Sequence, residues 1–404
     1  MQCETSNVSG TIAMKTKRRS AVAKRTKRIF ISDIHLGDAK CMGGLHPYGW
    51  FKKNIPVLAE FLDDQLNAPD VKEMVILGDL FDMWVLPVNY DPLISFANIS
   101  SNPANKLVID KLKTLATTPD VKLAYVPGNH DMGMDTGAIL KTRKFMETTF
   151  PGIRFFCNST IPWGIYNVGT LAAEHGSRYC LFNSPDIWTA KDTFLPLGYF
   201  ISRIAAYKVL QTGTEENYYD ILVRFLRDFI KQPDFVEDMF EAIAEDAGLK
   251  PDDIVKLKGV PGFPNSMTVD AIGKRYSNLI QNWTNTPGNI NVPAAAIGDL
   301  ENLSPAASLA YFDHFGSTIN IVIFGHTHIP VMDPHDLDPM ANTTAHGSGE
   351  PWNKIYVNCG SWIDGSKHGC TYVETEEDAD VRRHYVRLKS YPSKIVIKEG
   401  SVGL

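Results

Sequence analysis

Acidic, amide and imidazole side chains directly follow five short apolar runs of this chain, and no other feature of the sequence constrains the fold as strongly. Such runs, rich in β-branched and aromatic residues, are typical of buried strands. The runs and the polar residues after them are Ile29–Ser32 with Asp33 and His35, Met74–Leu77 with Asp79, Val121–Val126 with Asn129, His130 and Asp131, Thr170–Ala173 with His175, and Ile319–Phe324 with His326 and His328. Because ligands of open α/β sheets bind at the carboxyl ends of strands, we predict that these side chains meet in one site.

Helix-like segments alternate with the strand-like runs in the first half of the chain. Between the early runs lie Ile55–Gln65, whose apolar residues fall on one helical face, and Asn105–Ala116. This order of strand, helix, strand and helix predicts an α/β architecture. Further strand-like runs are Ile153–Cys157, Lys354–Val357 and Cys370–Val373, with Val381–Leu388 and Lys394–Lys398 expected as edge strands.

Strand-like runs disappear between about residues 184 and 304, where amphipathic helical segments replace them. These segments are Leu197–Gln211, Glu216–Lys231, Asp234–Ala247 and Val269–Trp283. Because strands on both sides are needed to complete the sheet, we predict one domain at residues 29–404 with a helical insertion at about 184–304. This insertion is called the cap below.

Charge is distributed unevenly along the chain. Residues 1–28 contain eight Lys and Arg against one Glu, which gives them a charge of +7. Because the net charge of the chain is −6, the other 376 residues carry −13. We therefore expect a disordered basic leader on an acidic body. The leader suits nucleic acid or an anionic membrane surface, whereas the acidic body disfavours a nucleic-acid groove. Without a long apolar run or an apolar signal segment, a cytoplasmic protein with at most peripheral membrane contact is expected.

The polar residues at the strand ends suit a particular metal chemistry. Carboxylate, amide oxygen and imidazole ligands without thiolate favour borderline divalent ions such as Mn, Fe or Zn. Two Asp, one Asn and four His exceed the needs of one ion. They suit a pair of ions that share a carboxylate, an arrangement that clamps the attacking and leaving oxygens of a displacement at phosphorus.

The ordered blocks SDIHLG, LGDLFD, PGNHD, EHG and FGHTH resemble those of the calcineurin-like metallophosphoesterases. The likeness covers residues 28–178 and about 305–375, and five blocks in order at strand ends make it specific. It implies an α/β fold arranged as a four-layer α/β/β/α sandwich. It also implies a hydrolase that uses two divalent transition-metal ions, with Mn favoured in vitro, to cleave phosphoric esters.

The resemblance further implies a role for each polar residue. The implied ligands are Asp33, His35 and His328 for the first metal, Asn129, His175 and His326 for the second, and Asp79 for both. A hydroxide that bridges the ions would attack the phosphorus. His130 would contact the phosphoryl oxygen or protonate the leaving group, and Asp131 would orient His130 or, alternatively, face solvent in a turn.

Two blocks are similar to those of the bacterial UDP-2,3-diacylglucosamine pyrophosphatase group: GDLFDMW at Gly78–Trp84 and YVNCGSW at Tyr356–Trp362. This likeness implies hydrolysis of a pyrophosphate bond in a nucleotide-sugar or lipid-linked substrate. The apolar face of Leu197–Gln211 could line an acyl-chain cleft. Core packing is the stronger interpretation of such a face.

Arg178, Asn183 and Arg203 are the candidates for binding substrate phosphate. A guanidinium group matches two phosphate oxygens. For Arg178, an ion pair with Glu174 or Asp186 is an equal alternative.

Other functions remain open from the sequence. A general phosphodiesterase or phosphomonoesterase would use the same metal centre. A nuclease would use the basic leader, but the acidic body disfavours it. A non-catalytic binding scaffold is disfavoured because every expected ligand and His130 are present.

Overall fold

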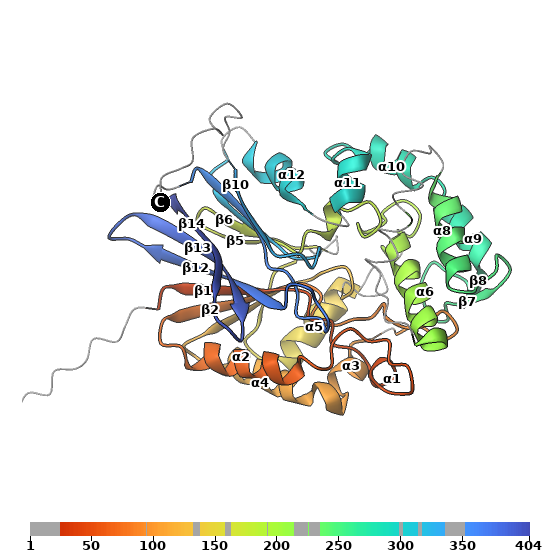
Figure 1. Cartoon of the computed structure of the whole chain (residues 1–404), viewed down its shortest axis with the longest axis horizontal. Helices are drawn as coiled ribbons and strands as arrows, with labels where there is room; N and C mark the ends of the chain where they lie inside the picture. The colour runs from red at the N-terminus through yellow and green to blue at the C-terminus, as the bar shows by residue number, and fades with distance from the viewer. Residues whose placement is uncertain are drawn as a thin grey trace, which may run out of the picture.

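Two β-sheets lie face to face in a computed structural model that describes residues 25–93, 95–131, 138–157, 163–191, 193–213, 225, 235–298, 302–313, 317–335 and 352–404 (Figure 1). The larger sheet has the strand order β14-β13-β12-β1-β2-β3-β4, and the smaller one has the order β10-β11-β9-β6-β5. The strand bounds are β1 Lys27–Ile31, β2 Val71–Leu77, β3 Lys122–Val126, β4 Arg154–Phe155, β5 Tyr166–Val168, β6 Leu171–Ala173, β9 Ile321–Phe324, β10 Val331–His335, β11 Lys354–Asn358, β12 Cys370–Asp378, β13 Arg383–Tyr391 and β14 Val396–Gly403.

The strands that end at the polar residues run parallel to one another within each sheet. In the larger sheet β1 pairs with β2 and β2 with β3, and in the smaller sheet β6 pairs with β9. Parallel strands covered on both faces have uninterrupted apolar sequences, which explains runs such as Met74–Leu77. Of the two C-terminal runs predicted as edge strands, only β14 lies at an edge, because β13 pairs with β12 on one side and with β14 on the other.

Apolar side chains fill the space between the sheets and cover both outer faces. Val75 of the larger sheet and Ile323 of the smaller one belong to the same core cluster. Helices α2, α4 and α5 cover the outer face of the larger sheet, and α12 lies over the smaller one (Figure 1). The predicted four-layer α/β/β/α sandwich is confirmed. The helix bounds are α1 Ala39–Met42, α2 Ile55–Asn67, α3 Ala97–Ser100, α4 Lys106–Thr117, α5 Ala138–Thr149, α6 Leu197–Thr212, α8 Phe235–Asp246, α9 Val269–Arg275, α10 Leu279–Asn285, α11 Val292–Gly298 and α12 Ser304–Ala307.

The cap lies between β6 and β9 in the chain and contains α6 and α8 to α11 (Figure 1). It also contains two short antiparallel strands, β7 (Ile254–Lys256) and β8 (Ser266–Thr268). The expectation of a purely helical insertion missed them because runs of three residues are shorter than the pattern that marks a strand. The helix predicted at Glu216–Lys231 lies outside the described residues except for position 225.

The boundary of the basic leader differs from the prediction. Lys27 and Arg28 belong to β1, and Arg28 is buried between the carboxylates of Glu73 and Glu377. Acidic partners on neighbouring strands therefore draw the end of the basic segment into the sheet. Residues 1–24 of the leader lie outside the described part of the chain.

The apolar face of α6 is packed inside the protein. Its six predicted face residues are all buried: Leu197, Phe200, Ile201, Ile204, Ala205 and Val209. This face is therefore core and does not line an open acyl-chain cleft. None of the helices in the described ranges combines the length and the apolar character needed to cross a membrane.

Candidate metal centre

The loops after five strands bring the predicted polar residues together at one edge of the two sheets. These residues are Asp33 and His35 after β1, Asp79 after β2, Asn129 and His130 after β3, His175 after β6, and His326 and His328 after β9. All of them are buried except His328, whose side chain is 21% exposed. The site therefore has donors from both sheets and one partly exposed member.

Five of these residues adopt a left-handed backbone conformation that side chains other than glycine rarely take. Their φ angles are 56° at Asp33, 57° at His35, 51° at Asp79, 72° at His326 and 60° at His328. Each such residue costs about 1–3 kcal/mol and persists only where the surroundings enforce it. Strain concentrated on the predicted ligands indicates that the fold holds them in place for a function.

Asp33, His35 and His328 form the first ligand group, with donor atoms within 4.8 Å of one another. The Nε2 atoms of His35 and His328 are 3.2 Å apart, and His328 Nε2 lies 3.2 Å from Asp33 Oδ1. Asp33 Oδ1 is buried and accepts no hydrogen bond from the described residues. A buried carboxylate oxygen between two imidazole nitrogens fits a divalent cation.

Asp79, His175 and His326 form the second group, also with donor atoms within 4.8 Å. His175 Nε2 lies 3.1 Å from Asp79 Oδ2 and 2.9 Å from Asn129 Oδ1. Asp79 Oδ2 is also 3.8 Å from His35 Nε2 of the first group. Asp79 thus stands between the groups, where one carboxylate can serve two ions.

Backbone contacts orient the donors toward the centre. His326 N donates to Asp33 Oδ2 and His130 N donates to Asp79 Oδ1, both at 2.9 Å, which leaves the other oxygen of each carboxylate for the centre. The Nδ1 atom of His175 donates to Leu77 O at 2.7 Å, so its Nε2 is free to act as a ligand.

Burial and neighbouring charges shift the pKa values in the site. Burial raises the pKa of Asp33, but His328 and His175 together lower it, to about 2. The pKa of Asp79 lies well below its ordinary value, because His175 and His130 outweigh the effect of burial. Both carboxylates are therefore ionised at neutral pH, and their charge attracts cations.

Asp82 is a site residue that sequence reasoning missed. Its Oδ2 lies 2.9 Å from His35 Nδ1, and its Oδ1 lies 3.0 Å from His130 Nδ1. One buried carboxylate thus orients both a predicted ligand and the predicted proton donor. Its position three residues after Asp79 in GDLFD was the available signal.

The orienting role predicted for Asp131 is corrected by this geometry. Asp131 accepts hydrogen bonds from Leu80 N at 2.9 Å and from Gly128 N at 2.6 Å, and it is fully buried rather than facing solvent. Burial and the nearby Asp79 raise its pKa to about 6. Asp131 therefore ties together the loops after β2 and β3, while Asp82 orients His130.

Replacing Asp82 with asparagine should lower kcat about 10²-fold and weaken binding of one metal ion about 10–100-fold. The N–H groups of Trp84 and Val85 donate to Asp82 Oδ1 and would hold the amide oxygen there. The amide nitrogen would then face His35 Nδ1 and drive the imidazole proton onto Nε2, the ligand atom. Kinetics with nitrophenyl phosphate esters and metal analysis measure both effects.

Asp38→Asn is the matched control, because Asp38 is a buried carboxylate that caps the N–H groups of Lys40 and Cys41 without a contact to the histidines. Asparagine caps a helix as well as aspartate does, so this variant should keep wild-type kinetics. Wild-type kinetics in Asp82→Asn would contradict the assigned role.

Two tryptophans flank the histidines. Trp84 stacks on His130 with ring centroids 4.3 Å apart, and Trp50 meets His35 edge to face at 4.8 Å. Trp84 is fully buried, whereas Trp50 is partly exposed. Asp82 contacts Nδ1 of His130, and Trp84 stacks on one face of the His130 ring. Nε2 is therefore the ring nitrogen of His130 that is left to carry or donate a proton.

The three predicted substrate contacts have partners within the protein. Arg178 forms a bidentate pair with Glu174, with distances of 2.7 and 2.9 Å, so the alternative weighed for it is confirmed. Arg203 is 1% exposed and donates mainly to backbone carbonyls. Asn183 is 2% exposed and accepts a hydrogen bond from Asn129. Arg203 and Asn183 are buried and Arg178, 25% exposed, is held by Glu174, so these contacts do not support their assignment to substrate binding.

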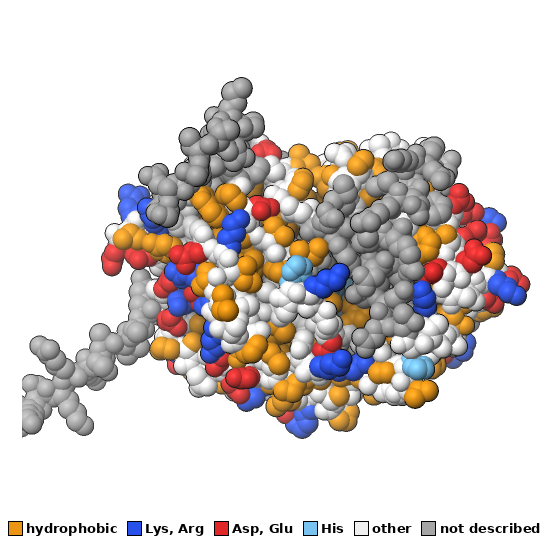
Figure 2. Space-filling view, in the orientation of Figure 1, with side chains coloured by type: hydrophobic (Ala, Val, Ile, Leu, Met, Phe, Trp, Pro, Cys, Tyr) orange, Lys and Arg blue, Asp and Glu red, His pale blue; other side chains and the backbone are white. Residues whose placement is uncertain are grey.

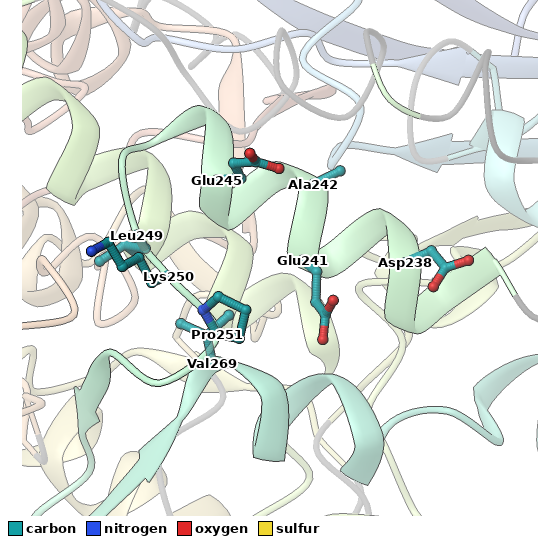
Figure 3. Close-up of a pocket in the computed structure, with 8 residues that line it drawn as sticks. All are labelled: Asp238, Glu241, Ala242, Glu245, Leu249, Lys250, Pro251 and Val269. Carbon is teal, nitrogen blue, oxygen red and sulfur yellow. The ribbon is translucent and has the colours of Figure 1, made fainter.

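A separate acidic group lies on the cap. Donor atoms of Glu237, Glu241 and Asp270 lie within 4.8 Å of one another, and Glu241 also lines a surface pocket of about 560 Å³ (Figure 3). All three side chains are partly exposed, and Lys274 pairs with Asp270 at 2.5 Å. This group is typical of a solvated acidic helix face.

The fold and the site define a class of protein. A mixed α/β sandwich delivers carboxylate, amide and imidazole donors from five strand ends to two adjoining groups, which suits binding of paired divalent cations. The sequence profile of the calcineurin-like phosphoesterases matches residues 26–330. The chain belongs to this family, which generally uses a dinuclear divalent metal centre.

Three solved structures share a weaker likeness with the chain. A purple acid phosphatase from yellow lupin (Lupinus luteus) seeds is 12% identical with a TM-score of 0.39, over 94% of this chain and 53% of that one, so the chain spans about half its length. A conserved uncharacterised Streptococcus pneumoniae protein, a predicted phosphoesterase, is 10% identical with a TM-score of 0.27, over 93% and 97%. GAP50, the anchor in the inner membrane complex of Plasmodium, is 11% identical with a TM-score of 0.33, over 94% and 89%. No curated protein matches the chain.

Proposed function

We propose that this chain hydrolyses a phosphoester or pyrophosphate bond with two divalent transition-metal ions, Mn, Fe or Zn. The observation that carries the proposal is the pair of ligand groups that adjoin at Asp79 and lie beside His130. The proposed ligands are Asp33, His35 and His328 for one ion, Asn129, His175 and His326 for the other, and Asp79 for both. When bound, the two ions supply charge neutralisation at the phosphate and lower the pKa of water.

His130 is the proposed proton donor to the leaving group. Its Nδ1 is engaged by Asp82, and Asp82 and Asp79 raise its pKa against the effect of burial. An imidazole that keeps its proton near neutral pH can transfer it from Nε2 to a departing oxygen. Trp84 limits rotation of the ring by stacking on its face.

A nucleotide-sugar pyrophosphate is the substrate class we propose. The blocks at Gly78–Trp84 and Tyr356–Trp362, similar to those of the UDP-2,3-diacylglucosamine pyrophosphatase group, support it. The buried face of α6 offers no support for an acyl-chain cleft, so the proposal does not require a lipid tail. We further propose a cytoplasmic location in which the basic residues before Lys27 allow contact with an anionic membrane surface.

Nucleic acid is not the proposed substrate. On the face drawn in Figure 2, Lys and Arg side chains of the described residues are interspersed with Asp and Glu. The −13 charge outside residues 1–28 would repel a phosphate backbone.

The decisive experiment compares substrate classes with purified, Mn-loaded full-length protein. The substrates are nitrophenyl phosphate, bis(nitrophenyl) phosphate, a UDP-sugar and single-stranded DNA. We expect close to two metal ions per chain, hydrolysis of the UDP-sugar between its phosphates, and a loss of about 10²–10⁴-fold in His130→Ala. Hydrolysis of only monoesters, only diesters or only DNA would replace the proposed substrate class. No hydrolysis by protein that holds two ions would refute the enzymatic proposal.

A further inference from the structure

The segment that leads into the cap meets the metal centre at Asn183. The Oδ1 atom of Asn183 accepts a hydrogen bond from Asn129 Nδ2 at 3.4 Å, and both side chains are at least 98% buried. Because the amide nitrogen of Asn129 faces Asn183, the Oδ1 atom of Asn129 faces His175 Nε2, at 2.9 Å. Asn183 thus sets which end of the Asn129 amide is presented to the centre.

Asn183 is itself held by the first turn of α6. Gly198 N donates to Phe182 O at 2.9 Å, which brings the helix backbone against the segment that carries Asn183. A Cβ at Gly198 would lie 2.3 Å from Asn183 Oδ1 and 2.8 Å from Phe182 O. Any larger residue at 198 would therefore push directly on the acceptor that orients Asn129.

Helix α6 is also fixed to the loop that carries Asp82 and Trp84. The guanidinium of Arg203 donates to the carbonyl oxygens of Leu86 at 3.0 Å and of Tyr90 at 2.6 Å. A shift of α6 relative to the sheets would therefore move Asn183 while also straining this loop. The cap and the metal centre are connected through packed, hydrogen-bonded atoms.

We infer that α6 of the cap sets the affinity of the ion site at Asn129, His175 and His326 by placing Asn183, which acts as a positioning residue. The inference rests on the proposed metal centre. It adds that the geometry of the cap and the occupancy of one ion site are coupled. Partners outside a ligand set commonly change metal affinity by about 10–100-fold.

The test is a titration of the metal-free full-length protein with Mn²⁺. Calorimetry and electron paramagnetic resonance measure the affinity of each ion site during this titration. In Asn183→Leu, which keeps the size but lacks the acceptor, one of the two sites should weaken about 10–100-fold and the other should change little. Asn183→Asp keeps the acceptor oxygen and should bind both ions within about threefold of wild type. If Asn183→Asp binds both ions normally while Asn183→Leu does not, the effect comes from the acceptor that orients Asn129 and not from a change in packing.

Gly198→Ala is a second route to the same site, because it displaces Asn183 without removing it. It should also weaken one site selectively. Gly273→Ala on α9 is the matched control, since a Cβ there meets its nearest atom at an ordinary 3.5 Å, and both sites should stay as in wild type.

Unchanged affinity for both ions in Asn183→Leu or in Gly198→Ala would overturn the inference, as would equal weakening in the leucine and aspartate variants. If Asn183→Leu does not fold, as judged by circular dichroism, Gly198→Ala decides alone. Failure of the proposed function is distinguishable, because the wild-type protein would then bind fewer than two ions or would hydrolyse no phosphoester when both are bound.

Discussion

Asp79→Asn should abolish Mn-dependent hydrolysis of nitrophenyl phosphates, a loss of about 10³-fold or more, and should reduce the metal content below two ions per chain. Asp79 has Oδ2 between His175 and His35, at 3.1 and 3.8 Å, while Oδ1 accepts the N–H of His130. A neutral amide loses the negative charge that attracts both cations. Kinetics and elemental analysis measure the two effects on the same sample.

The loss should arise in the centre and not from unfolding. The side chain of Asp79 occupies space next to Gly128, where a Cβ would lie 2.1 Å from Asp79 Oδ1. Asparagine has the same shape as aspartate and therefore fits the same space. The matched control is Glu237→Gln, a carboxylate-to-amide change on the acidic face of the cap, which should keep full activity. An active Asp79→Asn protein with two ions would contradict the assignment of Asp79.

Arg203→Met should lower the free energy of unfolding by roughly 3 kcal/mol or more, the largest stability effect we expect from one residue of the cap. All five guanidinium N–H groups have acceptors, and these are Leu86 O, Pro87 O, Tyr90 O and Lys256 O with the hydroxyl of Tyr199. Methionine fills a similar volume but leaves four buried carbonyls without this donor. Urea unfolding followed by circular dichroism and tryptophan fluorescence measures the change.

Gln211→Ala on the exposed side of the same helix is the control, and it should change stability by less than about 0.5 kcal/mol. Because the Leu86–Tyr90 segment follows Asp82 and Trp84, Arg203→Met should also reduce kcat. A methionine variant as stable as the wild type would show that the guanidinium contacts do not hold the cap.

The donor set of the metal centre could be predicted because each donor is local to one strand end. A run such as Ile29–Ser32 is apolar because both faces of its strand are covered, and the residue after it necessarily projects at the sheet edge. Parallel pairing then brings the edges of neighbouring strands together. Seven of the predicted donors meet for this reason, although they span positions 33 to 328.

Contacts made by long polar side chains could not be predicted in the same way. Arg178 and Arg203 have the residue type that binds phosphate, yet one pairs with Glu174 and the other with backbone carbonyls. Asp82 and Asp131 both follow donors closely in sequence, and only the packed loops show which carboxylate reaches His130. Residue type indicates what a side chain can bind, and packing decides which partner lies within reach.

By itself, the sequence of this chain determined the α/β class, the order of the strands that end in polar residues, and the chemical nature of the donors, because these follow from patterns of a few neighbouring residues. Only the tertiary structure decided that Asp82 is shared by His35 and His130, that the apolar face of α6 is core, and that Asn183 contacts Asn129. The physical reason is that such contacts join segments distant in the chain. Their distances exist only once the sheets and the cap have packed.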